Sequence, residues 1–181
     1  MAKKEKKSVK RKSSSTALST KNLAQIRLVL LDIDGILTDG RITWIEGTGW
    51  TASYSVLDGF GIRLLHREGI EVGFISGGSF TSHRKRAESL SIKHIYLGNE
   101  DKIGAYKAIQ LATGSNDQET AYMGDELFDI PLLERVGFAA TVPHAAKEVK
   151  KVSHYITKAQ GGFGAAREMI NLILEARKRK K

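Results

Sequence analysis

LVLLDIDGILTDG, residues 28–40, is the stretch that decides the fold of this chain. It opens as an unbroken apolar run and continues into two aspartates, Asp32 and Asp34, which are followed by Gly35. Such a run is typical of a parallel strand that is buried on both faces. Ligands of open parallel sheets bind beyond the carboxyl ends of the strands, so both aspartates stand where chemistry is expected.

Segments with strand and helix patterns alternate downstream of this strand. A β-hairpin with a glycine-rich turn is expected at about residues 41–56. Further strands are expected over 71–76, 94–96, 120–123 and 138–142, and helices over 62–67, 79–90, 102–113, 130–136, 145–152 and 165–176. This order predicts an α/β, Rossmann-like fold, in which an open parallel sheet carries helices on both faces and the hairpin is a small insertion.

Length and composition fit one globular domain. A chain of 181 residues builds a single full-sized core more readily than two. The absence of cysteine excludes disulfides, thiolate metal sites and cysteine nucleophiles. The sequence has neither an apolar stretch of the ~20 residues that a membrane span needs nor the apolar region of a secretory signal. We therefore expect a cytoplasmic protein without membrane insertion.

The net charge of +9 comes from the two ends of the chain. Residues 1–21 carry eight Lys or Arg and one acid, residues 177–181 are all basic, and residues 22–176 carry 16 basic and 19 acidic residues. This distribution of charge predicts a disordered basic tail over 1–21, a folded domain over 22–176 and a short basic tail over 177–181. A solubilising role for the tails is favoured over weak contact with nucleic acid or acidic lipid.

Polar side chains gather where the expected strands end. Ser76 ends the strand over 71–76 and Gly77 follows it, and Asp125 comes after the strand over 120–123. Lys102 opens the helix expected over 102–113, after a short loop. Each group alone has a plainer explanation as a turn, a helix cap or a solvated side chain. Their joint placement at one edge of the sheet favours a catalytic site.

The residue types suit phosphoryl transfer. A carboxylate such as Asp32 can attack phosphorus and form an aspartyl-phosphate, which divides one difficult displacement into two easier steps. Asp34 lies on the same side, because residues two apart on an extended chain share a face. It is the candidate that protonates the leaving oxygen and then deprotonates water.

Attack by one anion on another requires cations nearby. Asp32 and Asp125 offer the oxygen ligands that Mg²⁺ prefers. Lys102 can neutralise the transferring phosphoryl group. Candidates that donate hydrogen bonds to the phosphate oxygens are the Ser76 hydroxyl, the Gly77 backbone and Thr38. The expected ligand is a small phosphorylated metabolite.

These residues resemble the haloacid dehalogenase (HAD) superfamily of phosphotransferases over about residues 28–174. LLDIDGILTDG matches the first HAD motif, Ser76 the second, Lys102 the third and GDELFD, residues 124–129, the fourth. The resemblance implies Asp32 as nucleophile, Asp34 as acid/base and Mg²⁺ held by Asp32, the Asp34 carbonyl and Asp125. It also implies that Asp129 orients Lys102 or a metal-bound water.

Three further stretches are similar to the 3-deoxy-D-manno-octulosonate 8-phosphate (KDO 8-phosphate) phosphatase group within that superfamily. They are Thr38-Asp39-Gly40 running into the hairpin, Asp58-Gly59-Phe60-Gly61-Ile62, and Gly161-Gly162 followed by Gly164-Ala165. This resemblance implies a phosphorylated sugar or sugar acid as substrate. It also implies no separate cap domain and a homotetramer in which the hairpin of one subunit covers the site of its neighbour. The short intervals between the motifs independently leave no room for a lid domain.

The chain departs from that group at three positions. It has Leu57, Gly78 and Phe163 where the group usually has arginine, whose guanidinium is the favoured partner of a sugar-acid carboxylate. These departures leave the identity of the ester open. Nearby side chains that would compensate are Arg63, Arg84, Arg86 and His83. The five histidines show no paired metal spacing and are expected at the surface or in packing.

Two alternatives to a phosphatase remain. The first is a divergent relative that binds a phosphorylated ligand or a partner with little turnover, which the missing arginines favour. The second is a receiver-type signalling domain, which also places aspartates and a lysine on a parallel sheet. Receivers carry the phosphorylated aspartate at the end of the third strand, whereas the strand over 94–96 ends here without an acid.

Overall fold

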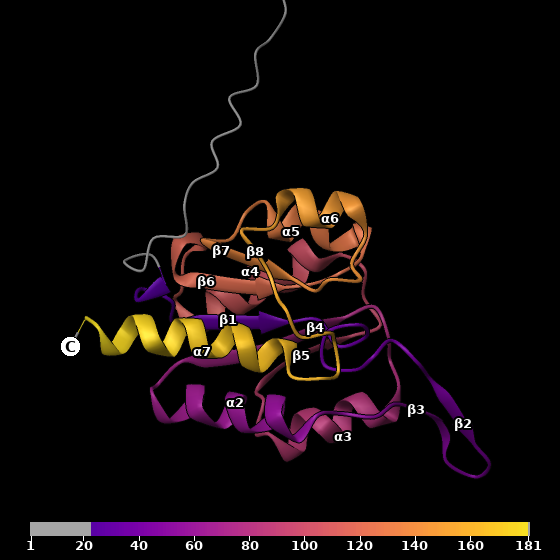
Figure 1. Ribbon diagram of the computed structural model, residues 1–181. Coiled ribbons are helices and arrows are strands. Elements are labelled where there is room, and N and C mark those ends of the chain that lie inside the picture. The colour runs from indigo at the N-terminus through magenta and orange to yellow at the C-terminus, as the bar shows by residue number, and fades with distance from the viewer. Residues whose placement is uncertain (1–22, 181) are drawn as a thin grey trace, which may run out of the picture.

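A six-stranded parallel sheet forms the centre of the molecule, in the order β5-β4-β1-β6-β7-β8 (Figure 1). The computed structural model describes residues 23–180, so the predicted N-terminal tail lies outside the described residues. The strands are β1 (Leu28–Leu31), β4 (Glu71–Ser76), β5 (His94–Leu97), β6 (Thr120–Met123), β7 (Phe138–Thr141) and β8 (Tyr155–Ile156). The expected fold class is confirmed.

The helices pack in two groups against the sheet. They are α2 (Val56–Arg67), α3 (Thr81–Ser89), α4 (Lys102–Thr113), α5 (Ile130–Leu133), α6 (Lys147–Val152) and α7 (Ala165–Lys178), with short 3₁₀ turns at Asp117–Glu119 and Leu127–Asp129. Figure 1 shows α2 beside α7 on one side of the sheet and α5 beside α6 on the other. None of the helices within residues 23–180 is long and apolar enough to cross a membrane.

β1 lies at the centre of the sheet because its side chains are apolar throughout. All four of its residues are buried, and it pairs with β4 on one side and with β6 on the other. The ladder extends one residue further, since the Asp32 amide donates to the Met123 carbonyl at 2.9 Å. The register therefore brings the loops after β1, β4 and β6 together at one edge of the sheet.

Several element boundaries differ from the expectations, and one strand was not expected. α2 begins at Val56, well before the expected helix at 62, because the Ser55 side chain accepts a hydrogen bond from the Leu57 amide and caps the helix. β8 was not expected, because a strand of two residues is too short to show a period. α7 continues to Lys178, so Arg177 and Lys178 are helical, although the sequence placed them in the C-terminal tail.

The β-hairpin projects from the body of the molecule (Figure 1). Its strands, β2 (Thr43–Ile45) and β3 (Gly49–Thr51), pair antiparallel with Trp44 opposite Trp50. The two indole rings meet edge to face with centroids 5.3 Å apart, yet 55% of Trp44 and 46% of Trp50 remain exposed. Within one subunit, the hairpin therefore presents a large apolar surface to solvent.

Candidate active site

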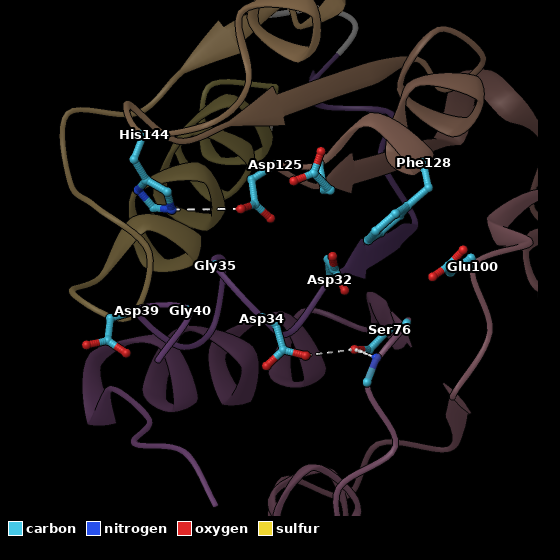
Figure 2. A pocket seen from close by; sticks show the side chains of 13 residues that line it. Asp32, Asp34, Gly35, Asp39, Gly40, Ser76, Glu100, Asp125, Phe128 and His144 are labelled. Atoms are coloured by element: carbon cyan, nitrogen blue, oxygen red, sulfur yellow. Dashed lines mark hydrogen bonds and ion pairs between the residues drawn. The ribbon is translucent and has the colours of Figure 1, made fainter. Parts of the chain in front are cut away.

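A pocket of about 380 Å³ opens at the carboxyl ends of β1, β4 and β6 (Figure 2). The loops after these strands supply most of its wall, as expected for an open parallel sheet. Its lining residues are Asp32, Asp34, Gly35, Asp39, Gly40, Ser76, Gly77, Gly78, Glu100, Asp125, Glu126, Phe128 and His144.

Asp32 lies at the base of this pocket and is almost fully buried. Its Oδ1 accepts a hydrogen bond from the Ile33 amide at 2.7 Å and lies 3.1 Å from Nζ of Lys102. Burial and the negative charge of Asp129 raise the pKa of Asp32 to about 8, although Lys102 opposes this shift. Without a further cation, the carboxylate that would attack phosphorus is thus costly to ionise.

Lys102 is fixed at the first residue of α4 with its side chain fully buried. Its Nζ donates to the Ile75 carbonyl at 2.7 Å and lies 3.3 Å from Oδ1 of Asp129. The ring of Phe128 covers the ammonium at 4.9 Å from the centroid. The lysine therefore links β4 to two carboxylates in a site with little access for water.

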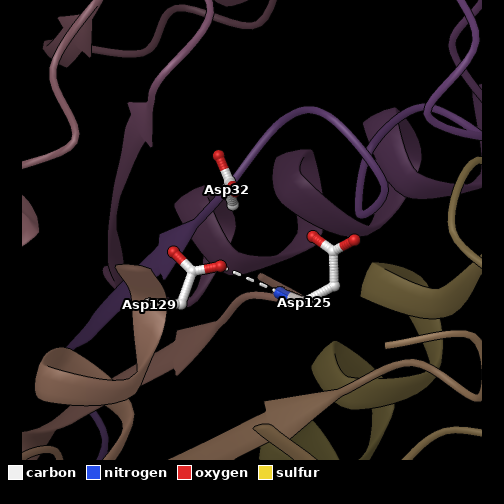
Figure 3. Close-up of side chains that lie close together, drawn as sticks. All are labelled: Asp32, Asp125 and Asp129. Carbon is white, nitrogen blue, oxygen red and sulfur yellow. Dashed lines mark hydrogen bonds between the residues drawn. The ribbon is translucent and has the colours of Figure 1, made fainter. Parts of the chain in front are cut away.

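Asp129 already has hydrogen-bond partners for both of its carboxylate oxygens. Oδ2 accepts from the Asp125 amide at 2.9 Å (Figure 3). Oδ2 also accepts from the Glu126 amide at 3.0 Å, and Oδ1 accepts from the Tyr122 hydroxyl at 2.5 Å. These bonds fix the carboxylate that contacts Lys102. The arrangement suits a residue that orients the lysine.

A divalent cation fits between the acids. Asp32, Asp125 and Asp129 each offer an oxygen, and these atoms lie within 4.8 Å of one another (Figure 3). Oδ1 of Asp125 is buried and has no hydrogen-bond partner among the described residues. Burial, with the charges of Asp129 and Glu126, raises the pKa of Asp125 to about 7. Since Asp129 is already engaged, Asp32 and Asp125 are the two carboxylates best placed to hold a hard cation.

Asp34 stands across the pocket from Asp125, next to the loop after β4 (Figure 2). Its Oδ2 accepts from the Ser76 hydroxyl at 3.4 Å, and its Oδ1 lies 3.3 Å from Nε2 of His83. The Ser76 hydroxyl oxygen also accepts from the Gly78 amide at 3.1 Å. Asp34 is partly open to the pocket, in contrast to the buried Asp32.

The candidate phosphate-binding residues fall in two different places. Ser76 and Gly77 line the pocket, as expected. Thr38 does not: it is fully buried, and its hydroxyl oxygen accepts from the amides of Gly35 and Gly40 at 3.3 and 3.2 Å. Its side chain shapes the loop after β1, and its contact with phosphate stays a prediction.

The rim of the pocket is acidic. Of the three positions without arginine, Gly78 lines the pocket, whereas Leu57 and Phe163 are exposed and are not among its lining residues. Among the lining residues outside the reacting group, the charged side chains are Asp39, Glu100 and Glu126, with His144 placed 3.8 Å from Asp125.

The basic residues expected to compensate do not line this pocket. Arg86 donates to the Ser55 carbonyl at 3.0 Å and lies over the Tyr54 ring, and Arg63 lies over the Phe60 ring. Arg84 is exposed on α3. Of the side chains named in the sequence analysis as replacements, only His83 contacts a residue of the site.

Sequence reasoning missed three lining residues, namely Glu100, Phe128 and His144. Glu100 and Phe128 were within reach, because they lie in the loops next to Lys102 and Asp129, at the edge already marked for chemistry. His144 follows β7, whose end showed no motif, and no signal in the sequence singled it out.

Comparison with known proteins places this site in a family. The model of haloacid dehalogenase-like hydrolases matches residues 74–169. The 3-deoxy-D-manno-octulosonate 8-phosphate phosphatase of Yersinia pestis is 37% identical over 153 residues, which cover 84% of this chain and 82% of that protein. The phosphatase of the same name from Escherichia coli K12 is 35% identical over 83% of this chain and 80% of its own length.

Solved structures agree with these relatives. The Moraxella catarrhalis 3-deoxy-D-manno-octulosonate 8-phosphate phosphatase, in complex with magnesium, phosphate and KDO, superposes with a TM-score of 0.85 at 36% identity. The match covers 88% of this chain and 92% of that one. The Yersinia pestis enzyme also gives a TM-score of 0.85, at 35% identity over 88% of this chain and 86% of its own.

Proposed function

The chain belongs to the haloacid dehalogenase-like hydrolases, within the KDO 8-phosphate phosphatase family, and from that premise we propose that it is a Mg²⁺-dependent phosphomonoesterase. Its proposed substrate is a small phosphorylated sugar or sugar acid of the KDO 8-phosphate type. The observation that carries the proposal is the placement of Asp32, buried beside Lys102, opposite the partly open Asp34.

Asp32 is the proposed nucleophile. One of its oxygens attacks phosphorus, the bond from phosphorus to the ester oxygen breaks, and an aspartyl-phosphate forms on Asp32. Oδ1 is held by the Ile33 amide and Lys102, so the carboxylate does not rotate freely. Fixing it in this way removes part of the orientational entropy that the attack would otherwise lose.

Asp34 is the proposed acid and base. In the first step, it gives a proton to the departing ester oxygen, so that the sugar leaves as an alcohol. In the second, it takes a proton from the water that attacks phosphorus, which releases phosphate and restores Asp32. Its partly open position suits both transfers.

Positive charge and hydrogen-bond donors stabilise the transferring phosphoryl group. Lys102 supplies the fixed ammonium, and the Ser76 hydroxyl and the Gly77 amide are the proposed donors to the phosphate oxygens. The Asp32 and Asp125 carboxylates, with the Asp34 carbonyl, would hold the metal, which supplies Lewis-acid neutralisation of charge when bound. Asp129 keeps Lys102 in place through its own three hydrogen bonds.

The substrate class follows from the relatives, and the rim of the pocket qualifies it. The relatives act, by name, on 3-deoxy-D-manno-octulosonate 8-phosphate, a sugar acid. Here the rim carries Asp39, Glu100 and Glu126, and the positions where the family usually has arginine hold Leu57, Gly78 and Phe163. A carboxylate-bearing leaving group would meet like charges at this rim within a single subunit. Phosphorylated sugars that lack a carboxylate are therefore part of the proposed substrate range.

The proposed working form is a cytoplasmic homotetramer in which the hairpin of each subunit covers a neighbouring site. The exposed Trp44–Trp50 pair at the tip of the hairpin and the open pocket support this arrangement. A covering partner would exclude water from the reaction and strengthen the electrostatic interactions inside the site.

Phosphate release from a panel of esters tests the proposal. The panel contains KDO 8-phosphate and matched phosphorylated sugars without a carboxylate, each assayed with Mg²⁺ and with EDTA. Mg²⁺-dependent release from any of them supports the phosphatase, and the ranking identifies the ester. Absence of release from all of them would instead favour the second candidate, a binding protein with little turnover, which the missing arginines motivate.

The receiver-type alternative receives no support from the fold. β5 ends at Leu97 and is followed by Gly98, so the third strand of the main sheet carries no acid at its end. The acids of this site follow β1 and β6 instead.

A further inference from the structure

His83 is a fully buried imidazole beside the pocket, at the third residue of α3. Its Nε2 lies 3.3 Å from Oδ1 of Asp34. Both ring nitrogens of His83 and Oδ1 of Asp34 lack a hydrogen-bond partner among the described residues. The Asp34 carboxyl group, which is proposed to transfer the proton, therefore has a buried, unpartnered oxygen that faces an unpartnered nitrogen of His83.

A structural role does not explain this imidazole. The Phe80 ring packs edge to face against it at 4.9 Å, and the Tyr54 ring lies at 6.4 Å. A leucine would fill such an aromatic environment without bringing polar atoms of its own into it. A buried polar group without a partner is destabilising because it has lost its hydrogen bonds to water, and native structures retain few of them.

Gly78 is tied to the same contact. A Cβ atom at residue 78 would lie 2.5 Å from Oδ2 of Asp34 and 2.9 Å from Cε1 of His83. Any side chain there would therefore collide with the two partners at once. The glycine that replaces an expected arginine is the residue that lets His83 and Asp34 approach each other.

We propose that His83 is a positioning residue that holds the Asp34 carboxyl group in its productive orientation. A small rotation of the ring would direct an N–H from Nε2 to Oδ1 across the observed 3.3 Å. Oδ2, which lies next to the Ser76 hydroxyl, is then the oxygen left to exchange the proton with the ester oxygen and with water. This inference rests on the proposed function, because it assigns a role within that reaction.

Two esters with different leaving groups distinguish this positioning role from a general structural one. An alkyl ester, such as the best sugar phosphate of the panel, needs a proton on its departing oxygen, whereas 4-nitrophenyl phosphate does not. Loss of Asp34 orientation should therefore lower kcat/KM for the alkyl ester selectively. The parameter kcat/KM is the right readout, because it reports the steps through departure of the alcohol.

The experiment compares His83→Leu, His83→Gln and the wild type on both esters with Mg²⁺. We expect His83→Leu to lower kcat/KM for the alkyl ester about 10- to 100-fold while changing that for 4-nitrophenyl phosphate by less than about twofold. His83→Gln, which retains a donor near the position of Nε2, should restore most of the loss. His66→Leu makes the same chemical change on α2, outside the pocket lining, and should match the wild type on both esters.

Equal losses on the two esters, or no loss on either, would overturn the inference while leaving the phosphatase intact. If His83→Leu does not fold, His83→Asn replaces it, because its amide is too short to occupy the position of Nε2 and should show the same selective loss against His83→Gln. A wild-type chain that hydrolyses neither ester overturns the proposed function, and this inference falls with it.

Discussion

At the scale of a single residue, the surroundings of Asp32 determine whether its carboxyl group is ionised. It is buried among acids, so its ionised form is disfavoured, and the pKa rises to about 8 from the ordinary 3.8. Lys102 offsets this only in part, since the ammonium is shared with Asp129 and the Ile75 carbonyl. A bound divalent cation would complete the balance of charge, which links metal binding to the state of the nucleophile.

Because ionised Asp32 is disfavoured without a metal, we predict that Asp32→Asn stabilises the metal-free protein. Between about pH 4 and pH 8, Asp32 is ionised in the unfolded chain but holds its proton in the folded one, so the wild type loses stability as pH rises through this range. Asparagine does not titrate. In EDTA at pH 8, thermal unfolding should give a Tm about 2–4 °C above the wild type, and the difference should vanish near pH 4.

Magnesium should reverse the order of the two proteins. It binds the folded wild type and raises its Tm, whereas the Asp32→Asn variant has lost a carboxylate ligand. Asp101→Asn serves as the control, because Asp101 is an exposed N-cap of α4 and asparagine caps equally well. A Tm of Asp32→Asn below that of the wild type in EDTA at pH 8 would contradict the expected cost of ionising Asp32 in the folded protein.

The placement of some site residues could be predicted from the sequence, whereas the placement of others depends on tertiary contacts. Asp32, Ser76 and Asp125 follow strands whose apolar pattern is plain, so their meeting at one edge could be predicted. Thr38 stands in the same loop as the aspartates, yet its hydroxyl turns inward to the loop amides. The contact of His83 with Asp34 joins side chains 49 positions apart, and only the packing of α3 against the loop after β1 creates it.

At the scale of elements, periodicity located the long segments and failed on the short ones. α4 and β6 match their expected limits, because their patterns are unbroken and their caps are clear. The hairpin was expected to reach residue 56, but β3 ends at Thr51 and Ser55 caps α2. β8 pairs through only two residues, which no pattern can reveal.

One tertiary hydrogen bond joins α2 to α7 and carries a prediction. The buried Asp58 of α2 accepts from the Arg167 amide in the first turn of α7 at 2.7 Å. Asp58→Ala removes this cap and should lower the free energy of unfolding by about 1–2 kcal/mol, read as a lower urea midpoint. Glu88→Ala, at an exposed position of α3, should leave the midpoint unchanged. Equal midpoints for the two variants would refute the capping role.

At the scale of the whole molecule, one subunit alone leaves its active site without a lid. The hairpin extends away from the body, and the intervals after Thr38 and Ser76 hold no lid within residues 23–180 (Figure 1). The apolar side chains of the hairpin, Ile42, Trp44, Ile45 and Trp50, are all exposed. The lack of a lid could be anticipated from the spacing of the motifs, whereas the surface that the hairpin is proposed to cover would belong to a second subunit.

Disrupting the hairpin should therefore change both assembly and activity. The double substitution Trp44→Ser/Trp50→Ser removes the paired indoles without touching the pocket lining. We expect a smaller assembly by light scattering coupled to size exclusion and a higher KM, because water is no longer excluded. Leu111→Ser, at an 89% exposed leucine of α4, is the control and should keep the mass of the wild type. An unchanged mass for the double variant would contradict the proposed cover.

The most direct test of the proposed mechanism measures phosphate release by the wild type and by Asp32→Asn on the best ester of the panel. Both proteins are assayed at equal concentration with Mg²⁺ and with EDTA, and circular dichroism verifies that the variant is folded. We predict release by the wild type only with Mg²⁺ and a loss of at least about a thousandfold in the variant, since no other group replaces an attacking carboxylate. Equal rates for the two proteins, or release that persists in EDTA, would contradict the assignment of Asp32 as a magnesium-dependent nucleophile.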